Sequence, residues 1–141
     1  MADLKAASRS ILTEAASRTE RPAVITLSGD LGAGKTTFVQ ELARELGVTE
    51  SVTSPTFVIM KRYETAHVAF SSLIHIDAYR LEEASELSVL GFTEVLNETG
   101  AIVCIEWPEH VASLMPVDAI QLVFTFDGDE RTLTVTYGNK N

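Results

Sequence analysis

The sequence predicts an α/β fold in which a mixed β-sheet lies between two layers of helices, a three-layer arrangement. An apolar run at 23–27 precedes a glycine-rich loop, and apolar residues at helical spacing fill 35–46, so a strand–loop–helix unit is expected. Further apolar runs at 101–107 and 119–127 are typical of additional strands. With 141 residues, the chain is long enough for one domain with a proper core, so we expect a single domain over 1–141.

The first half of the chain begins with a predicted helix over 3–19, whose apolar residues recur at helical spacing until Arg21-Pro22 closes it. The strand at 23–27 follows, and the helix over 35–46 is expected to end at Gly47. The segment "SVTSPTF" is predicted to be a loop.

The second half is expected to supply most of the sheet. "FVIMKRYE" (57–64) and "VAFSSLIHID" (68–77) are predicted strands joined by a short polar turn around 65–67, and 81–100 is predicted to hold one or two short helices separated near Gly91. A buried strand at 101–107 and a terminal hairpin of 119–127 and 131–137 complete the prediction.

Charge and composition exclude several classes of function. The net charge is −9 and the pI is about 4.7, which disfavours a nucleic-acid surface because such surfaces need clustered Lys and Arg. No apolar stretch approaches the ~18 residues of a membrane span, and no signal peptide is evident. Cys104 is the single cysteine and is expected to be buried and inert, so we expect a cytoplasmic protein.

The glycine-rich loop matches the pattern G-x-x-x-x-G-K-[ST] at Gly29, Gly34, Lys35 and Thr36. Glycines let the backbone N–H groups approach a polyphosphate, and the helix N-terminus adds partial positive charge. Lys35, expected to be exposed, would reach the β- and γ-phosphates, and the Thr36 hydroxyl would complete a Mg²⁺ shell. A guanine-reading N-K-x-D is absent, which favours ATP. The residues predicted to hold the nucleotide are Asp30, Leu31, Gly32, Ala33, Gly34, Lys35, Thr36 and Thr37.

Two carboxylates are candidates for the group that holds the magnesium ion beside such a loop. Asp77 ends "LIHID" and Glu106 ends "IVCIE", and the pattern alone does not rank them. The strand before Glu106 is the more uniformly apolar, which favours Glu106 beside the metal and leaves Asp77 to orient a water or act as a base.

Other residues near these motifs have two interpretations each. The loop residues Thr53, Ser54, Pro55 and Thr56 could sense the γ-phosphate, or Pro55 could simply enforce an extended turn. Trp107 is either a core aromatic or part of the site, and Arg80 either pairs with a carboxylate or touches phosphate or a partner. The three histidines share no metal-ligand spacing, and His75 is expected to be a strand residue beside the site.

Five strings in this order, "GDLGAGKTTF", "SPTF", "HIDAYRL", "ELSVLGF" and "IEWPE", closely resemble the bacterial TsaE (YjeE) family from about Val24 to Pro116. That family is the ATPase component of the machinery that makes threonylcarbamoyladenosine in tRNA. The resemblance implies a P-loop NTPase-like fold, binding of ATP and Mg²⁺, and ATPase activity that is weak without partners. It also implies assembly with TsaD and TsaB, which modify the adenosine beside the anticodon, with tRNA contacted only through the complex.

The resemblance also implies roles for single residues. Thr36 and Glu106 would bind magnesium, Asp77 would be required for turnover together with Lys35 and Glu106, and 53–56 would be a switch-like loop. Trp107 would lie near the active site, and Arg131 would lie near the nucleotide. The family's N-terminal segment usually adds a strand and residues near adenine, whereas this chain begins with "MADLKAAS" where that segment would finish, and no adenine contact is assigned to it.

Two other functions remain open on the sequence. The chain could bind ATP as a structural or regulatory ligand without significant turnover. It could also be a small-molecule kinase, although such enzymes usually carry an Arg-rich lid, and only 11 Lys and Arg are present.

Overall fold

The computed structural model describes residues 4–17, 21–29, 34–53, 55, 58–127 and 130–137. Its elements in chain order are α1 (Leu4–Ala16), β1 (Ala23–Ser28), α2 (Lys35–Glu45), β2 (Met60–Glu64), β3 (Ser72–Asp77), α3 (Ala84–Val89), α4 (Phe92–Val95), β4 (Ala101–Glu106), the 3-10 helix η1 (Pro108–Leu114), β5 (Ile120–Asp127) and β6 (Glu130–Thr136).

The strands form one six-stranded mixed sheet in the order β2-β3-β4-β1-β5-β6. The four inner strands β3, β4, β1 and β5 run parallel, while β2 and β6 pair antiparallel with their neighbours at the two edges. The carboxyl ends of the four parallel strands therefore lie along the same edge of the sheet, where the loops that follow them can combine into one site.

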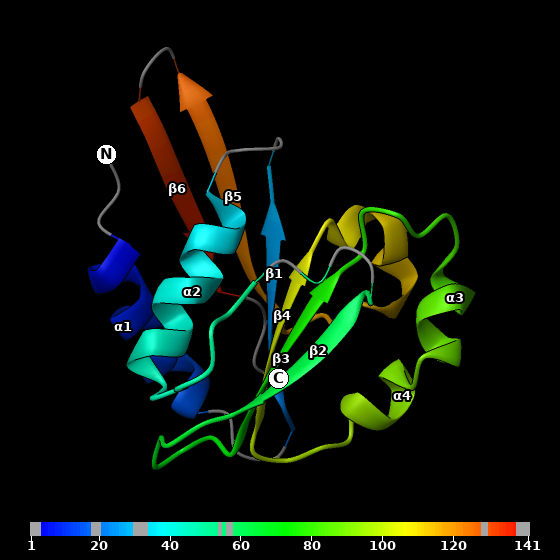
Figure 1. Ribbon diagram of the computed structural model, residues 1–141. Coiled ribbons are helices and arrows are strands. Elements are labelled where there is room, and N and C mark those ends of the chain that lie inside the picture. The colour runs from blue at the N-terminus through cyan, green and yellow to red at the C-terminus, as the bar shows by residue number, and fades with distance from the viewer. Residues whose placement is uncertain are drawn as a thin grey trace.

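Helices cover both faces of this sheet, as Figure 1 shows: α1 and α2 lie on one side and α3 and α4 on the other. Successive side chains of each strand point to opposite faces of the sheet, so the core consists of two clusters, one on each face. In β4, Ile102 and Cys104 join the cluster that packs against α1 and α2, whereas Val103 and Ile105 join the cluster that packs against α3, α4 and η1. The predicted mixed sheet with a helical layer on each face is confirmed.

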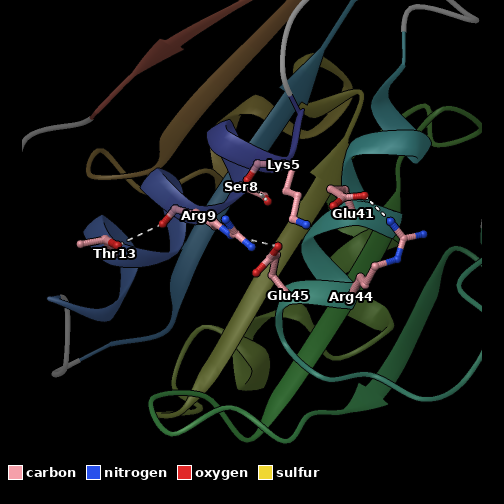
Figure 2. A network of polar contacts seen from close by, with 7 residues as sticks. All are labelled: Lys5, Ser8, Arg9, Thr13, Glu41, Arg44 and Glu45. Carbon is pink, nitrogen blue, oxygen red and sulfur yellow. Dashed lines mark hydrogen bonds and ion pairs between the residues drawn. The ribbon is translucent and has the colours of Figure 1, made fainter.

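Helix α1 packs against α2 mainly through apolar side chains. Ile11, Leu12 and Ala15 of α1 are buried in the same cluster as residues of α2. Figure 2 shows Arg9 of α1 reaching Glu45 of α2, with 3.2 Å between Arg9 Nε and Glu45 Oε1. Because Arg9 is well exposed, this ion pair contributes only about 0–1 kcal/mol, and the buried apolar groups hold the two helices together.

The predicted elements differ from the observed ones mainly at their ends. Helix α2 ends two residues before Gly47, whose φ of 78° terminates it as predicted. The strand expected over 57–64 starts only at Met60, because Ile59 adopts a φ of 69° that an extended strand does not allow. The strand expected over 68–77 starts at Ser72, so the connection between these two strands is longer than predicted. Within the part of the chain that the structure describes, no helix has the length and apolarity to cross a membrane.

Candidate nucleotide-binding site

The glycine-rich loop leaves the carboxyl end of β1 and leads into the first turn of α2. Gly29 and Gly34 flank it with φ values of 144° and 107°, which side-chain-bearing residues rarely adopt. Gly34 occupies the N-cap position of α2, and no described side chain caps this helix end. The N-terminus of α2 is therefore ready to receive an anion, in the context that the motif requires. The predicted loop residues Asp30, Leu31, Gly32 and Ala33 lie outside the described residues.

Lys35 is buried, and the expectation that it is exposed is wrong. Only 4% of its surface is accessible, because its side chain folds back over the start of the loop. Its ammonium Nζ donates to the carbonyl oxygen of Gly29 at 2.7 Å and lies 3.7 Å from the centre of the Trp107 ring. A carbonyl and an aromatic face both stabilise a cation, which explains how a charged group is tolerated here.

Trp107 is held at this position by an unusual backbone conformation. It follows β4 with φ 60° and ψ 51°, and its N–H donates to the carbonyl of Leu27 on β1 at 3.2 Å. Left-handed geometry at a tryptophan costs roughly 1–3 kcal/mol, and it turns the ring toward Lys35. Tyr79 and His110 surround the other sides of the ring, with centroid distances of 5.1 and 5.7 Å. Trp107 thus contacts the lysine of the motif as well as neighbouring aromatic rings.

The two strand-end carboxylates are neighbours, but only one of them is shown in contact with α2. Asp77 and Glu106 are register partners at the ends of β3 and β4. Thr36 Oγ1 lies 3.4 and 3.3 Å from the two carboxylate oxygens of Glu106. Asp77 instead accepts a hydrogen bond from the backbone N–H of Tyr79 at 3.0 Å. Because β4 lies directly beside β1 and β3 lies one strand farther away, Glu106 is the carboxylate next to the predicted magnesium threonine.

The family model that matches this chain is described as "Threonylcarbamoyl adenosine biosynthesis protein TsaE" and covers residues 3–133. The chain belongs to the TsaE family. The resemblance of the five sequence strings to TsaE is thereby confirmed.

Individual TsaE proteins align over most of the chain. The tRNA threonylcarbamoyladenosine biosynthesis protein TsaE of Bacillus subtilis (strain 168) is 42% identical over 119 residues, which is 83% of this chain and 72% of that protein. The protein of the same name from Treponema pallidum (strain Nichols) is 41% identical over 118 residues, covering 82% of this chain and 83% of the other. Among solved structures, the crystal structure of Bacillus subtilis YdiB superimposes with a TM-score of 0.72 at 31% identity, covering 99% of this chain and 83% of that one.

Two oxygen-bearing side chains of the site, those of Thr36 and Glu106, can be compared with the ligand shell of a magnesium ion. No cluster of three or more His, Cys, Asp or Glu that could hold a metal occurs among the described residues. Mg²⁺ commonly takes one or two protein oxygens and completes its shell with phosphate oxygens and water. Adjacent oxygens around Mg²⁺ at about 2.1 Å lie roughly 3 Å apart, and the Thr36–Glu106 separation of 3.3 Å is close to this spacing. These two residues therefore fit the ion.

His75 contacts Glu106 directly, which the sequence analysis did not foresee. Its side chain is fully buried, and its Nε2 lies 2.6 Å from Glu106 Oε2. The alternation of side chains along a strand could have predicted this contact. Leu73, His75 and Asp77 share one face of β3, so the polar side chain at 75 must lie on the same side of the sheet as the strand-end carboxylate.

Cys104 lies on the same face of β4 as Glu106 but is chemically unavailable. Its thiol is buried, and burial raises the pKa of the Cys104 thiol strongly, with the negative charge of Glu106 adding to the effect. The thiolate is the nucleophile in cysteine chemistry, so this cysteine is inert, as the sequence analysis predicted.

The structure describes only some of the other predicted residues. Thr37 is exposed in the first turn of α2, and Arg80 is exposed in the turn that follows Asp77. In the predicted switch-like loop, Thr53 is exposed and Pro55 is buried, while Ser54 and Thr56 lie outside the described residues. Gln40 of α2 donates to the carbonyl of Val52 at 2.9 Å, which ties the residue before this loop to the helix that follows the glycine-rich loop. The side chain of Arg131 is also outside the described part.

Proposed function

We propose that this TsaE-family chain is a P-loop ATPase that binds Mg-ATP, hydrolyses it slowly by itself, and drives or resets a TsaD–TsaB complex during threonylcarbamoyl modification of the adenosine next to the anticodon. One observation carries the ATPase part of this proposal. The Thr36 hydroxyl and the Glu106 carboxylate face each other at 3.3 Å, beside a glycine-flanked loop and the N-terminus of α2. Family membership carries the part that concerns tRNA modification.

Each residue of the site has a task in this proposal. When bound, Mg-ATP supplies the γ-phosphoryl group and a divalent cation that neutralises its charge. The N-terminus of α2 and the glycine-rich loop would donate backbone N–H groups to the phosphates. Lys35, which contacts the Gly29 carbonyl and the Trp107 ring, would turn to the phosphates, and Thr36 and Glu106 would hold the cation.

Asp77 is assigned to the water that attacks the phosphate. It is 7% exposed and ends the strand next to Glu106, so it lies within the site but outside the Thr36–Glu106 pair. A carboxylate in that place orients a water or accepts its proton, interactions that matter mainly in the transition state.

The charge of the chain supports an indirect relation to tRNA. With a net charge of −9, the chain has little means of releasing counterions from a nucleic acid. The partner subunits are therefore proposed to hold the tRNA. The loop at 53–56 is the proposed link between nucleotide state and partner docking, because Gln40 of α2 holds Val52, the residue directly before it.

Phosphate release by the purified chain, measured alone and again with TsaD and TsaB, tests the activity. Slow release that increases with the partners is expected. Tight ATP binding with no release in either case would favour a regulatory ATP-binding subunit, and phosphate transfer to a small molecule would favour a kinase.

The carboxylate roles are tested by titrating Mg²⁺ against binding of a non-hydrolysable ATP analogue. Glu106→Ala is expected to weaken the magnesium dependence of binding and also turnover. Asp77→Asn is expected to lower kcat by about 10²–10⁴ while leaving analogue affinity nearly unchanged. Glu94→Ala, which removes an exposed carboxylate from α4, is the control and should match the wild type. Loss of the magnesium effect in Asp77→Asn but not in Glu106→Ala would reverse the two assignments.

A further inference from the structure

We propose that His75 is a positioning residue that fixes the Glu106 carboxylate in the orientation that binds the magnesium ion. This inference rests on the proposed function, because it concerns the same cation. Its starting observation is the buried contact of 2.6 Å between His75 Nε2 and Glu106 Oε2.

His75 contacts Glu106 from the neighbouring strand β3, whereas Thr36 contacts it from α2. Glu106 is 4% exposed and its Oε2 receives His75 Nε2, while both of its oxygens face the Thr36 hydroxyl at 3.3–3.4 Å. The contact with Thr36 is long for an O–H···O hydrogen bond, whereas the contact with His75 is short. Of these two contacts, His75 is therefore the stronger restraint on the rotation of the carboxylate.

The proposed role requires His75 to donate from Nε2 to the Glu106 carboxylate. A carboxylate that binds a cation only accepts hydrogen bonds, so the donor in this contact is the imidazole. The other ring nitrogen, Nδ1, is buried and has no hydrogen-bond partner among the described residues. As an unprotonated acceptor it leaves no buried N–H unsatisfied, which is the less costly way to bury the ring.

A histidine that orients a ligating carboxylate is an outer-shell partner of the metal, and removing such partners typically lowers metal affinity or activity 10–100-fold. A purely structural histidine would affect the stability of the sheet and leave metal affinity unchanged. Metal affinity, measured without turnover, therefore distinguishes the two roles.

The probe is Mn²⁺, whose binding to the chain with a saturating non-hydrolysable ATP analogue is followed by electron paramagnetic resonance. His75→Leu removes the donor, and His75→Gln replaces it with an amide N–H on a side chain of similar reach. We expect a 10–100-fold higher Kd for Mn²⁺ in His75→Leu, recovery to within a few-fold of the wild type in His75→Gln, and unchanged analogue affinity without metal. Ile74→Val, a mild core change on the opposite face of β3, controls for loss of stability and should bind Mn²⁺ normally.

Circular dichroism and urea unfolding establish that each variant is folded. If His75→Leu does not fold, His75→Asn replaces it, because its amide is one methylene too short to reach Glu106, and it should bind Mn²⁺ as weakly as predicted for leucine. A wild-type Kd in a folded variant that lacks the donor, or failure of His75→Gln to recover affinity, overturns the positioning role while leaving the proposed function intact. Wild-type protein that binds the analogue with no effect of Mn²⁺ or Mg²⁺ overturns the proposed magnesium site, and the role of His75 with it.

Discussion

Replacing Gly29 with alanine is expected to damage this protein in two separable ways. Gly29 has a φ of 144°, and a Cβ at this position would lie 2.5 Å from the carbonyl oxygen of Phe124 and 3.1 Å from its Cβ. The first atom belongs to the backbone of β5, which is fixed by pairing with β1 and β6 and cannot move aside cheaply. The added methyl group must therefore displace the start of the P-loop.

The magnitude follows from two contributions. Forcing a side-chain-bearing residue to positive φ costs about 1–2 kcal/mol, and overpacking of this kind adds about 1–3 kcal/mol. We therefore expect the free energy of unfolding to fall by about 2–5 kcal/mol in Gly29→Ala. At this chain length each kcal/mol lowers Tm by roughly 4 °C.

Gly91→Ala is the matched control for backbone strain. Gly91 also has a positive φ, 96°, but the nearest atom of the described residues to a Cβ there would be Glu94 Oε2, at 3.6 Å. Only the strain of about 1–2 kcal/mol is expected, so the two variants should differ by the packing contribution of about 1–3 kcal/mol. Gly34→Ala places the same strain inside the glycine-rich loop and should resemble Gly91→Ala in stability, because among the described residues its Cβ would meet only Phe124 Cδ2, at 3.9 Å.

Urea unfolding followed by circular dichroism measures the three differences, and binding of an ATP analogue is measured on the same samples. Gly29→Ala should also bind the nucleotide more weakly, because displacing the start of the loop moves the backbone N–H groups that are proposed to hold the phosphates. If Gly29→Ala is no less stable than Gly91→Ala, the close approach between the P-loop and β5 does not restrict this position, and the reasoning fails.

Three further predictions concern the lysine, the cysteine and the charge. Addition of ATP should change the fluorescence of Trp107, the single tryptophan, as Lys35 leaves its ring. Lys35→Met should fold, bind ATP poorly and lack this fluorescence change. An identical response in Lys35→Met would contradict the prediction. Cys104 should react with a thiol reagent only after unfolding. Because the pKa of its thiol is raised in the folded state, the unfolded chain loses the thiol proton at a lower pH. The free energy of unfolding should therefore fall as pH rises above about 9.0. The isolated chain should not bind tRNA measurably in a gel-shift titration at physiological salt, and a sub-micromolar, salt-sensitive affinity would contradict this expectation.

The sequence by itself determined the type and approximate position of most elements. Continuous apolar runs marked β1 and β4, helical spacing and Gly47 marked α2, and the G-x-x-x-x-G-K-[ST] pattern marked the loop between β1 and α2. These signals are local, since they depend on the periods of strands and helices and on the conformational freedom of glycine. For the same reason the two strand-end carboxylates were recognised as candidates.

Only the tertiary structure decided how those elements meet. Thr36 and Glu106 are 70 residues apart, and they face each other because β4 inserts between β1 and β3, an order that no local period encodes. The burial of Lys35 follows from the left-handed turn at Trp107, and the contact of His75 with Glu106 follows from the parallel register of β3 and β4. Strand order and register are set by the packing of the whole core on both faces of the sheet, so the contacts within the site emerge only when the chain is folded.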